Sequence, residues 1–222
     1  IHCFNSDRYT KGIDILQNLV SKCSKPCDYA AVYTFLALMY EQVQKPENAM
    51  EAYQAVLKYD DSRSTVWSNL GALHRKKGYH KEAIECYKKA LEADPKNEYA
   101  YNNMGNSYFR MGEYQKAVDL AQKALEIKPA FIQALDLLCI SYAAMGDEAK
   151  CKEYFDLSIS SGGNPATLQN ALKVIREGNL AIDSFAPIPY EIEKACDMVY
   201  RETALPFMRI GLTEEDTNSR FG

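Results

Sequence analysis

The sequence has no strong excess of either charge and no long apolar run. Its 222 residues carry 26 Lys and Arg against 30 Asp and Glu, a formal net charge of −4. Proteins that bind DNA or RNA need a basic surface, so nucleic acid is not an expected partner. The most apolar stretch, residues 30–40, is interrupted by Thr34. It is well short of the roughly 18 to 20 residues that a membrane span needs, so no membrane association is predicted.

Signals for export are also missing. The chain begins at Ile1 without an initiator Met. It then lacks the features of a signal peptide, which are a basic stretch followed by an apolar run and a small-residue cleavage site. We expect a fragment of a longer protein, with no visible signal peptide. Seven cysteines, an odd number spread along the chain, favour free thiols in a reducing compartment. The expected location is therefore the cytoplasm.

Motifs of catalytic sites are absent from the sequence. It contains no G-x-S-x-G, no Gly-rich phosphate loop and no H-E-x-x-H. Cys23 and Cys27 form one C-x-x-x-C pair, but no second pair of Cys or His at a zinc-like spacing completes four ligands. We therefore predict no enzyme activity, no cofactor and no metal site.

A 34-residue repeat organises the middle of the chain. Aromatic, apolar and small residues recur in the same order, with no insertion between blocks. The spacing predicts four consecutive units at residues 30–63, 64–97, 98–131 and 132–163. The blocks that align are Tyr33-x-x-Leu36-Ala37-x-x-Tyr40, Trp67-x-x-Leu70-Gly71-x-x-His74, Tyr101-x-x-Met104-Gly105-x-x-Tyr108 and Leu135-x-x-Leu138-Cys139-x-x-Tyr142.

Each unit is predicted to form two helices joined by a turn. Small and aromatic residues in the second half of each unit recur at spacings of three and four, which places them on one helical face. The turns are expected at Gly78, Gly112 and Gly146, because Gly readily ends a helix in the left-handed conformation. Gly71 and Gly105 instead lie inside helices, where Gly costs roughly 1 kcal/mol relative to Ala. We interpret both as points of close helix packing.

This pattern resembles the tetratricopeptide-repeat family over residues 30–163. The resemblance rests on an aromatic at unit position 4, Leu at 7, Gly at 8, Tyr at 11, Ala at 20 and 27, an aromatic at 24 and Pro at 32. It implies an all-α right-handed superhelical solenoid of helix hairpins. The outer units depart from the pattern, with Asp61 at the Pro position of the first and Cys139 at the Gly position of the fourth.

Three further residues are interpreted from their unit positions. Cys139 and Cys151 occupy positions 8 and 20, which normally touch, and we expect packing residues in preference to a redox pair. His74 replaces the usual Tyr at position 11 and is expected to be partly buried.

The flanking segments are expected to add helices to the array. Residues 1–29 are interpreted as a partial N-terminal repeat, with a helix at 8–22 and a connection that runs through Asp28. Residues 164–222 are predicted to form a further helix at 165–177, a C-terminal capping helix at 190–204 and a tail from Leu205. The tail is interpreted as loosely packed beyond this cap. The alternative is that its apolar and acidic residues lie in a groove of the repeats, its own or a neighbour's, and regulate access to that groove.

The family resemblance implies a concave wall built from the first helix of each unit. Residues at positions 2, 5, 6, 9, 12 and 13 face a ligand there. Asn69 and Asn103 share position 6, and a carboxamide both donates to and accepts from the backbone of an extended peptide. Asn is also common at such positions without contacting a peptide, and that alternative stays open. The candidate peptide-binding residues are Asn69, Lys76, Tyr99, Asn102, Asn103, Asn106, Arg110 and Gln133.

The predicted function is a non-catalytic protein-protein interaction module or scaffold that binds a peptide or protein segment in this groove. One alternative is a structural or self-assembly role through the terminal helices. Another is the non-catalytic arm of a larger enzyme. Some relatives grip a C-terminal Glu-Glu-Val-Asp with a five-residue clamp. Fitted to the first three units, this clamp is matched only at Asn69, and fitted one unit later it is matched only at Asn103. Recognition of the heat-shock chaperone tail is therefore not expected.

Overall fold

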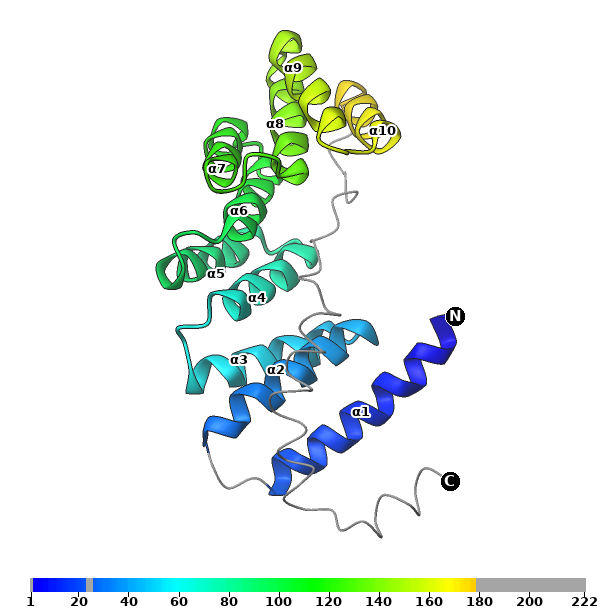
Figure 1. The fold of residues 1–222 in the computed structure, drawn as a ribbon, viewed down its shortest axis with the longest axis vertical. Coiled ribbons are helices and arrows are strands. Elements are labelled where there is room, and N and C mark those ends of the chain that lie inside the picture. Colours follow the sequence, from blue (N-terminus) through cyan, green and yellow to red (C-terminus); the bar gives the residue numbers. More distant parts are fainter. Residues whose placement is uncertain (1, 23–25, 179–222) are drawn as a thin grey trace. The chain divides into compact units, whose positions relative to one another are not determined.

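The computed structural model describes residues 2–22 and 26–178, with side chains at 9–18, 20–21 and 30–178 (Figure 1). Every regular element in this part of the chain is an α-helix, which confirms the all-α class. The helices are α1 (His2–Lys22), α2 (Pro26–Gln42), α3 (Pro46–Tyr59), α4 (Ser64–Lys76), α5 (His80–Ala93), α6 (Glu98–Arg110), α7 (Tyr114–Ile127), α8 (Ile132–Met145), α9 (Glu148–Ser160) and α10 (Pro165–Arg176).

The described residues divide into two compact parts. The N-terminal part runs to Tyr59 and contains α1, α2 and α3, whereas the C-terminal part begins at Asp60 and contains α4 to α10. In the N-terminal part, α2 packs against both α1 and α3. Ile13 of α1 is buried, and Gln17 Nε2 donates a hydrogen bond of 2.8 Å to Tyr40 Oη of α2.

Two predicted boundaries near the N-terminus are wrong. α1 begins at His2 instead of residue 8, and α2 begins at Pro26, inside the segment predicted to be a connection. A Pro is favourable in the first turn of a helix, because its missing N–H has no partner there in any case and its φ angle suits the helix. The sequence analysis placed Pro26 within a connection, whereas in the structure it starts a helix.

The C-terminal part is an array of helix hairpins. α4 packs against α5, α6 against α7 and α8 against α9, and α10 packs against α8 (Figure 1). The first helix of each hairpin begins 34 residues after the previous one, at Ser64, Glu98 and Ile132. The turns contain Gly78, Gly112 and Gly146 with φ of +80°, +78° and +80°, which confirms the predicted left-handed turns.

Small residues let neighbouring helices approach closely, both within a hairpin and between hairpins. A Cβ atom placed on Gly71 of α4 would lie 2.8 Å from Cε1 of Tyr87 on α5, and one on Gly105 of α6 would lie 2.9 Å from Cδ2 of Leu137 on α8, in the next hairpin. Both distances are too short for two carbon atoms in contact. The interpretation of Gly71 and Gly105 as points of close packing is therefore confirmed.

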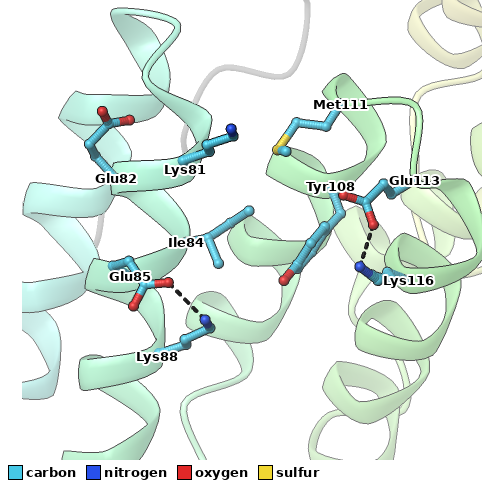
Figure 2. Close-up of a pocket in the computed structure, with 9 residues that line it drawn as sticks. All are labelled: Lys81, Glu82, Ile84, Glu85, Lys88, Tyr108, Met111, Glu113 and Lys116. Carbon is cyan, nitrogen blue, oxygen red and sulfur yellow. Dashed lines mark hydrogen bonds and ion pairs between the residues drawn. The ribbon is translucent and has the colours of Figure 1, made fainter.

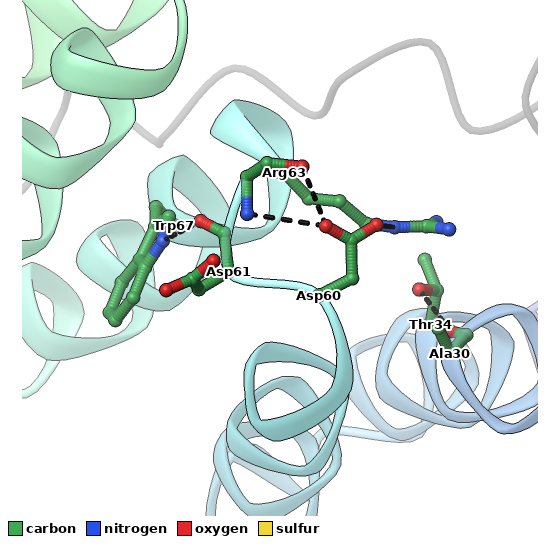
Figure 3. A network of polar contacts seen from close by, with 7 residues as sticks. Ala30, Thr34, Asp60, Asp61, Arg63 and Trp67 are labelled. Carbon is green, nitrogen blue, oxygen red and sulfur yellow. Dashed lines mark hydrogen bonds and ion pairs between the residues drawn. The ribbon is translucent and has the colours of Figure 1, made fainter. Parts of the chain in front are cut away.

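Side-chain hydrogen bonds hold the turn that precedes α4, where the repeat pattern has Asp61 in place of Pro (Figure 3). Asp60 Oδ1 accepts from Ser62 N at 3.2 Å and from Ser62 Oγ at 2.6 Å, and its Oδ2 accepts from Arg63 Nε at 2.7 Å. These bonds hold the pKa of Asp60 below its usual value. Trp67 Nε1 also donates to the Asp61 carbonyl oxygen at 2.8 Å. These hydrogen bonds thus restrain the turn at the position where other units have a proline ring.

The helix predicted at residues 165–177 corresponds to α10. Asn164 Oδ1 caps it by accepting from Ala166 N at 3.0 Å and Thr167 N at 3.2 Å. The predicted capping helix at 190–204, the tail and the side chains of Cys23 and Cys27 lie outside the described residues. Within residues 2–22 and 26–178, no helix has the length and apolar character needed to cross a membrane.

Candidate functional site

The predicted ligand-binding residues lie on the first helices of three neighbouring hairpins. α4 contributes Asn69 and Lys76, and α8 contributes Gln133. The other five residues are on α6, at helical spacings that place them on adjoining faces. α6 contacts both α4 and α8, so all three helices contribute to one continuous surface, which we call the first-helix wall.

Three asparagines of α6 are enclosed instead of open. Asn102, Asn103 and Asn106 expose 2%, 6% and 8% of their surface. Among the other predicted residues only Lys76 is exposed, and Asn69, Tyr99, Arg110 and Gln133 are half-buried. The unit position of a residue does not report how closely the neighbouring helices surround it, and sequence reasoning therefore missed this burial.

The enclosed asparagines differ in how their polar atoms are satisfied. Asn106 Nδ2 donates to the Asn102 carbonyl oxygen at 3.0 Å, and Ser107 Oγ donates to the Asn103 carbonyl oxygen at 3.1 Å. Asn102 Oδ1, in contrast, is buried and accepts no hydrogen bond from any described residue. A buried acceptor without a donor costs about 1–3 kcal/mol, and a donor from a ligand would relieve this cost if the side chains that enclose Asn102 moved aside.

Tyr99 is held at the turn that leads into α8. Its ring meets Phe131 edge to face at a centroid distance of 5.2 Å, and Lys128 Nζ lies 5.5 Å from the Tyr99 ring centre. Tyr99 therefore contributes to packing between units, in addition to any contact with a ligand.

The chemical character of the wall changes from α4 to α8. Lys76 and Arg110 stand at the C-terminal ends of α4 and α6. α8 instead presents Ala143 and Ala144, half-buried, near its own C-terminal end. Asp136 of α8 accepts a hydrogen bond of 2.5 Å from Ser158 Oγ, and burial raises the pKa of this carboxyl. The first-helix wall therefore has cationic residues at the C-terminal ends of α4 and α6 and apolar residues at the C-terminal end of α8.

Sequence reasoning missed a set of Lys-aromatic contacts that connect the two helices of each hairpin. They follow the repeat and join either positions 4 and 26 or positions 11 and 19. In the hairpin of α4 and α5, position 11 is His74 and position 19 is Glu82. The distances from Nζ to the ring centre are 4.3 Å for Lys89–Trp67, 5.8 Å for Lys123–Tyr101, 5.1 Å for Lys116–Tyr108 and 4.8 Å for Lys150–Tyr142.

A depression of about 410 Å³ lies between α5 and the hairpin of α6 and α7 (Figure 2). Lys88 and Glu85 form an ion pair at 2.7 Å, and Lys116 pairs with Glu113. These paired charges leave little net charge for recruiting a ligand. The residues that line the depression are Lys81, Glu82, Ile84, Glu85, Lys88, Tyr108, Met111, Glu113 and Lys116.

Three residues singled out from the sequence lie as predicted. Cys139 and Cys151 touch, with their sulfur atoms 3.7 Å apart, and both are buried. His74 is half-buried, and burial lowers its pKa below 6.5. No cluster of three or more His, Cys, Asp or Glu that could hold a metal occurs in the part of the chain that the structure describes.

Comparisons with known proteins agree with this architecture. Two models of the tetratricopeptide repeat match the chain, one over residues 30–63 and the other over residues 62–130. Residues 30–130 are therefore tetratricopeptide repeats, and the described part of the chain is an all-α array of helical repeats. No curated protein gave a significant match.

Several solved structures of MamA share the fold. One crystal structure is 21% identical, with a TM-score of 0.62, and the match covers 67% of this chain and 85% of that one. A second is 20% identical, with a TM-score of 0.63 and coverage of 71% and 84%. A double mutant of MamA is 17% identical, with a TM-score of 0.63 and coverage of 72% and 92%. At these identities the likeness concerns the fold alone.

Proposed function

We propose that the chain is a non-catalytic protein-interaction scaffold that holds an extended protein segment along the first-helix wall of α4, α6 and α8. The presence of tetratricopeptide repeats supports a role in binding proteins. The free thiols of Cys86, Cys139 and Cys151 favour a reducing compartment, and we include a cytoplasmic location in the proposal.

The observation that carries the proposal is the unpartnered Asn102 Oδ1 in the middle of the wall. A backbone N–H of an extended segment is a donor that every peptide sequence supplies. Asn69, one repeat earlier, brings a second carboxamide to the same wall, and Asn103 lies beside Asn102. The wall thus favours main-chain recognition, with selectivity added at its ends.

The charges of the wall define the preferred segment. Lys76 is exposed at the end of α4, and Arg110 lies at the equivalent position of α6. The corresponding end of α8 is apolar at Ala143 and Ala144. A segment with a carboxylate near α4 and α6 and apolar side chains near α8 would match this distribution.

The experiment uses 12-residue peptides selected by phage display on the full chain. The strongest peptide is synthesised with a fluorophore, and its dissociation constant is measured by anisotropy. Asn102→Leu should weaken binding roughly 5- to 150-fold, the equivalent of about 1–3 kcal/mol for the lost acceptor. The thermal midpoint of the free Asn102→Leu variant should not fall, because Leu removes an unsatisfied buried group.

Two charge variants complete the experiment. Lys76→Glu should weaken binding of an acidic peptide and reduce its dependence on salt. Lys152→Glu on α9 makes the same charge change at an exposed site away from the first helices and should leave binding unchanged. The proposal fails if Asn102→Leu binds as tightly as the natural chain, or if Lys76→Glu and Lys152→Glu weaken binding equally.

A further inference from the structure

Two buried thiols meet across the hairpin of α8 and α9. Cys139 Sγ and Cys151 Sγ are 3.7 Å apart, and the residues expose 0% and 2% of their surface. We propose that Cys139 and Cys151 form a reversible disulfide when the protein meets a peroxide, and that this bond fixes α8 to α9.

The repeat explains why these two positions suit a covalent bond. Units 64–97 and 98–131 have Gly at position 8 and Ala at position 20, the smallest pair of side chains along the hairpin. Helix backbones therefore approach most closely there, and the fourth unit puts a thiol on each side. A disulfide bond is about 2.0 Å long, so the two sulfur atoms need to come roughly 1.7 Å closer. Two side chains on one hairpin can share that movement.

The two thiols have different surroundings, which favours Cys151 as the nucleophile. Cys151 lies in the first turns of α9, where the positive end of the helix dipole stabilises a thiolate, whereas Cys139 lies in the middle of α8. Burial raises the pKa of both thiols, and the guanidinium of Arg176 on α10 opposes this rise by a smaller amount. Arg176 is held near them by Glu148, with Nη2 and Oε2 2.6 Å apart.

The chemistry balances with hydrogen peroxide as the oxidant. The Cys151 thiolate attacks one peroxide oxygen, which breaks the O–O bond and gives a sulfenic acid and, after protonation, water. Cys139 then attacks the sulfenic sulfur, loses its proton, and a second water leaves as the S–S bond forms. In total, two thiols are oxidised and one peroxide is reduced to two waters. A reducing thiol reverses the reaction by exchange.

Burial makes the reaction slow in the closed fold. Both cysteines belong to a buried cluster that includes Leu168, Leu172 and Ile175 of α10. Peroxide therefore reaches the sulfur atoms only when packing around α10 opens. Once formed, the bond joins α8, part of the first-helix wall, to its partner helix and restrains the separation of the hairpin. The proposal does not depend on the proposed function.

The test treats the full reduced chain with hydrogen peroxide, blocks the remaining thiols with iodoacetamide and digests the protein with trypsin. Cleavage after Lys150 places Cys139 and Cys151 on separate peptides. The expected product is a linked pair of these peptides, lighter by two hydrogen atoms and separated by a reductant. Circular dichroism of the treated chain should show unchanged helix content.

Matched variants make the assignment specific. Cys151→Ala restores the residue found at position 20 of the two preceding units, and it should abolish the linked product while the chain stays folded. Cys86→Ala removes a buried thiol elsewhere and should leave the product unchanged. Arg176→Gln removes the cation near both thiols and should slow the reaction roughly threefold.

Three results would overturn the proposal. One is oxidation of the folded chain to sulfinic or sulfonic acid with no linked peptide. Another is a linked product in which Cys139 or Cys151 is joined to a different cysteine. The third is a linked product that forms only after urea has unfolded the chain, because the reaction would then not depend on the folded hairpin that holds the two thiols together.

Discussion

Replacing Gly71 by Ala tests the close approach of α4 and α5. A Cβ at this position would lie 2.8 Å from Cε1 of Tyr87 and 3.0 Å from both its Cδ1 and its Cζ. The Tyr87 side chain is fully buried, with 0% of its surface exposed. The ring therefore has little room to move away, and the added methyl group should separate the two helices or force the ring from its preferred orientation.

Two opposing contributions determine the size of the effect. Ala favours a helix interior over Gly by about 0.5–1 kcal/mol. Extra volume in a well-packed core destabilises a protein by typically about 1–3 kcal/mol. The clash involves three ring atoms of Tyr87, and we expect it to outweigh the helix propensity. The expected net change for Gly71→Ala is a loss of about 1 kcal/mol in the free energy of unfolding.

Urea denaturation followed by the fluorescence of Trp67 measures this change. Trp67 is the single tryptophan of the chain and lies on α4, the same helix as Gly71. Gly71→Ala should lower the urea midpoint without changing the slope of the transition.

A double-mutant cycle separates the clash from other effects. Tyr87→Leu replaces the ring with a side chain that leaves more space beside Gly71, and in this background the same Gly71→Ala substitution should raise the midpoint. The reasoning is refuted if Gly71→Ala stabilises the chain in the natural background, because the methyl group then meets no resistance from the ring.

Two further predictions concern pH. Asp136→Asn should raise the free energy of unfolding at pH 7, because burial raises the pKa of Asp136 in the folded chain and Asn keeps an oxygen for Ser158 Oγ. The gain should shrink as the pH falls towards 3.8, because the carboxyl is protonated first in the folded chain, where its pKa is higher, and in both states below 3.8. An equal gain at pH 3 and pH 7 in urea titrations would contradict this origin. His74→Tyr combined with Glu82→Lys should reproduce the Tyr-Lys pair of the next two hairpins. The unfolded chain binds the His74 proton more tightly, so the natural chain loses stability below pH 6.5, and thermal midpoints from pH 5 to pH 8 should show a weaker pH dependence for the double variant.

Much of the fold could be predicted because a repeat protein is specified mainly by local patterns. The 34-residue spacing marks Ser64, Glu98 and Ile132, where α4, α6 and α8 begin. Gly71 and Gly105 indicated close packing. An interior Gly destabilises a helix, so its presence suggests that another group fills the space where a Cβ atom would lie. The start of α2 at Pro26 was missed because a Pro that breaks a helix and a Pro that starts one give the same local signal.

The candidate site was predicted less completely. Its residues were assigned to the correct helices, but the sequence did not indicate that Asn102, Asn103 and Asn106 are enclosed or that Asn102 Oδ1 has no donor among the described residues. Tyr99 was predicted as a ligand contact, and the structure packs it against Phe131. Burial and hydrogen bonding at these residues depend on side chains from other helices.

The sequence by itself determined the helical class, the hairpin period, the turns and the contact between Cys139 and Cys151, since each of these depends on spacing within one repeat unit. Only the tertiary structure decided how much of the first-helix wall is accessible and which polar atoms lack a partner. Accessibility is a property of several helices packed together. The sequence of a single helix does not indicate which side chains of the next hairpin will pack against it.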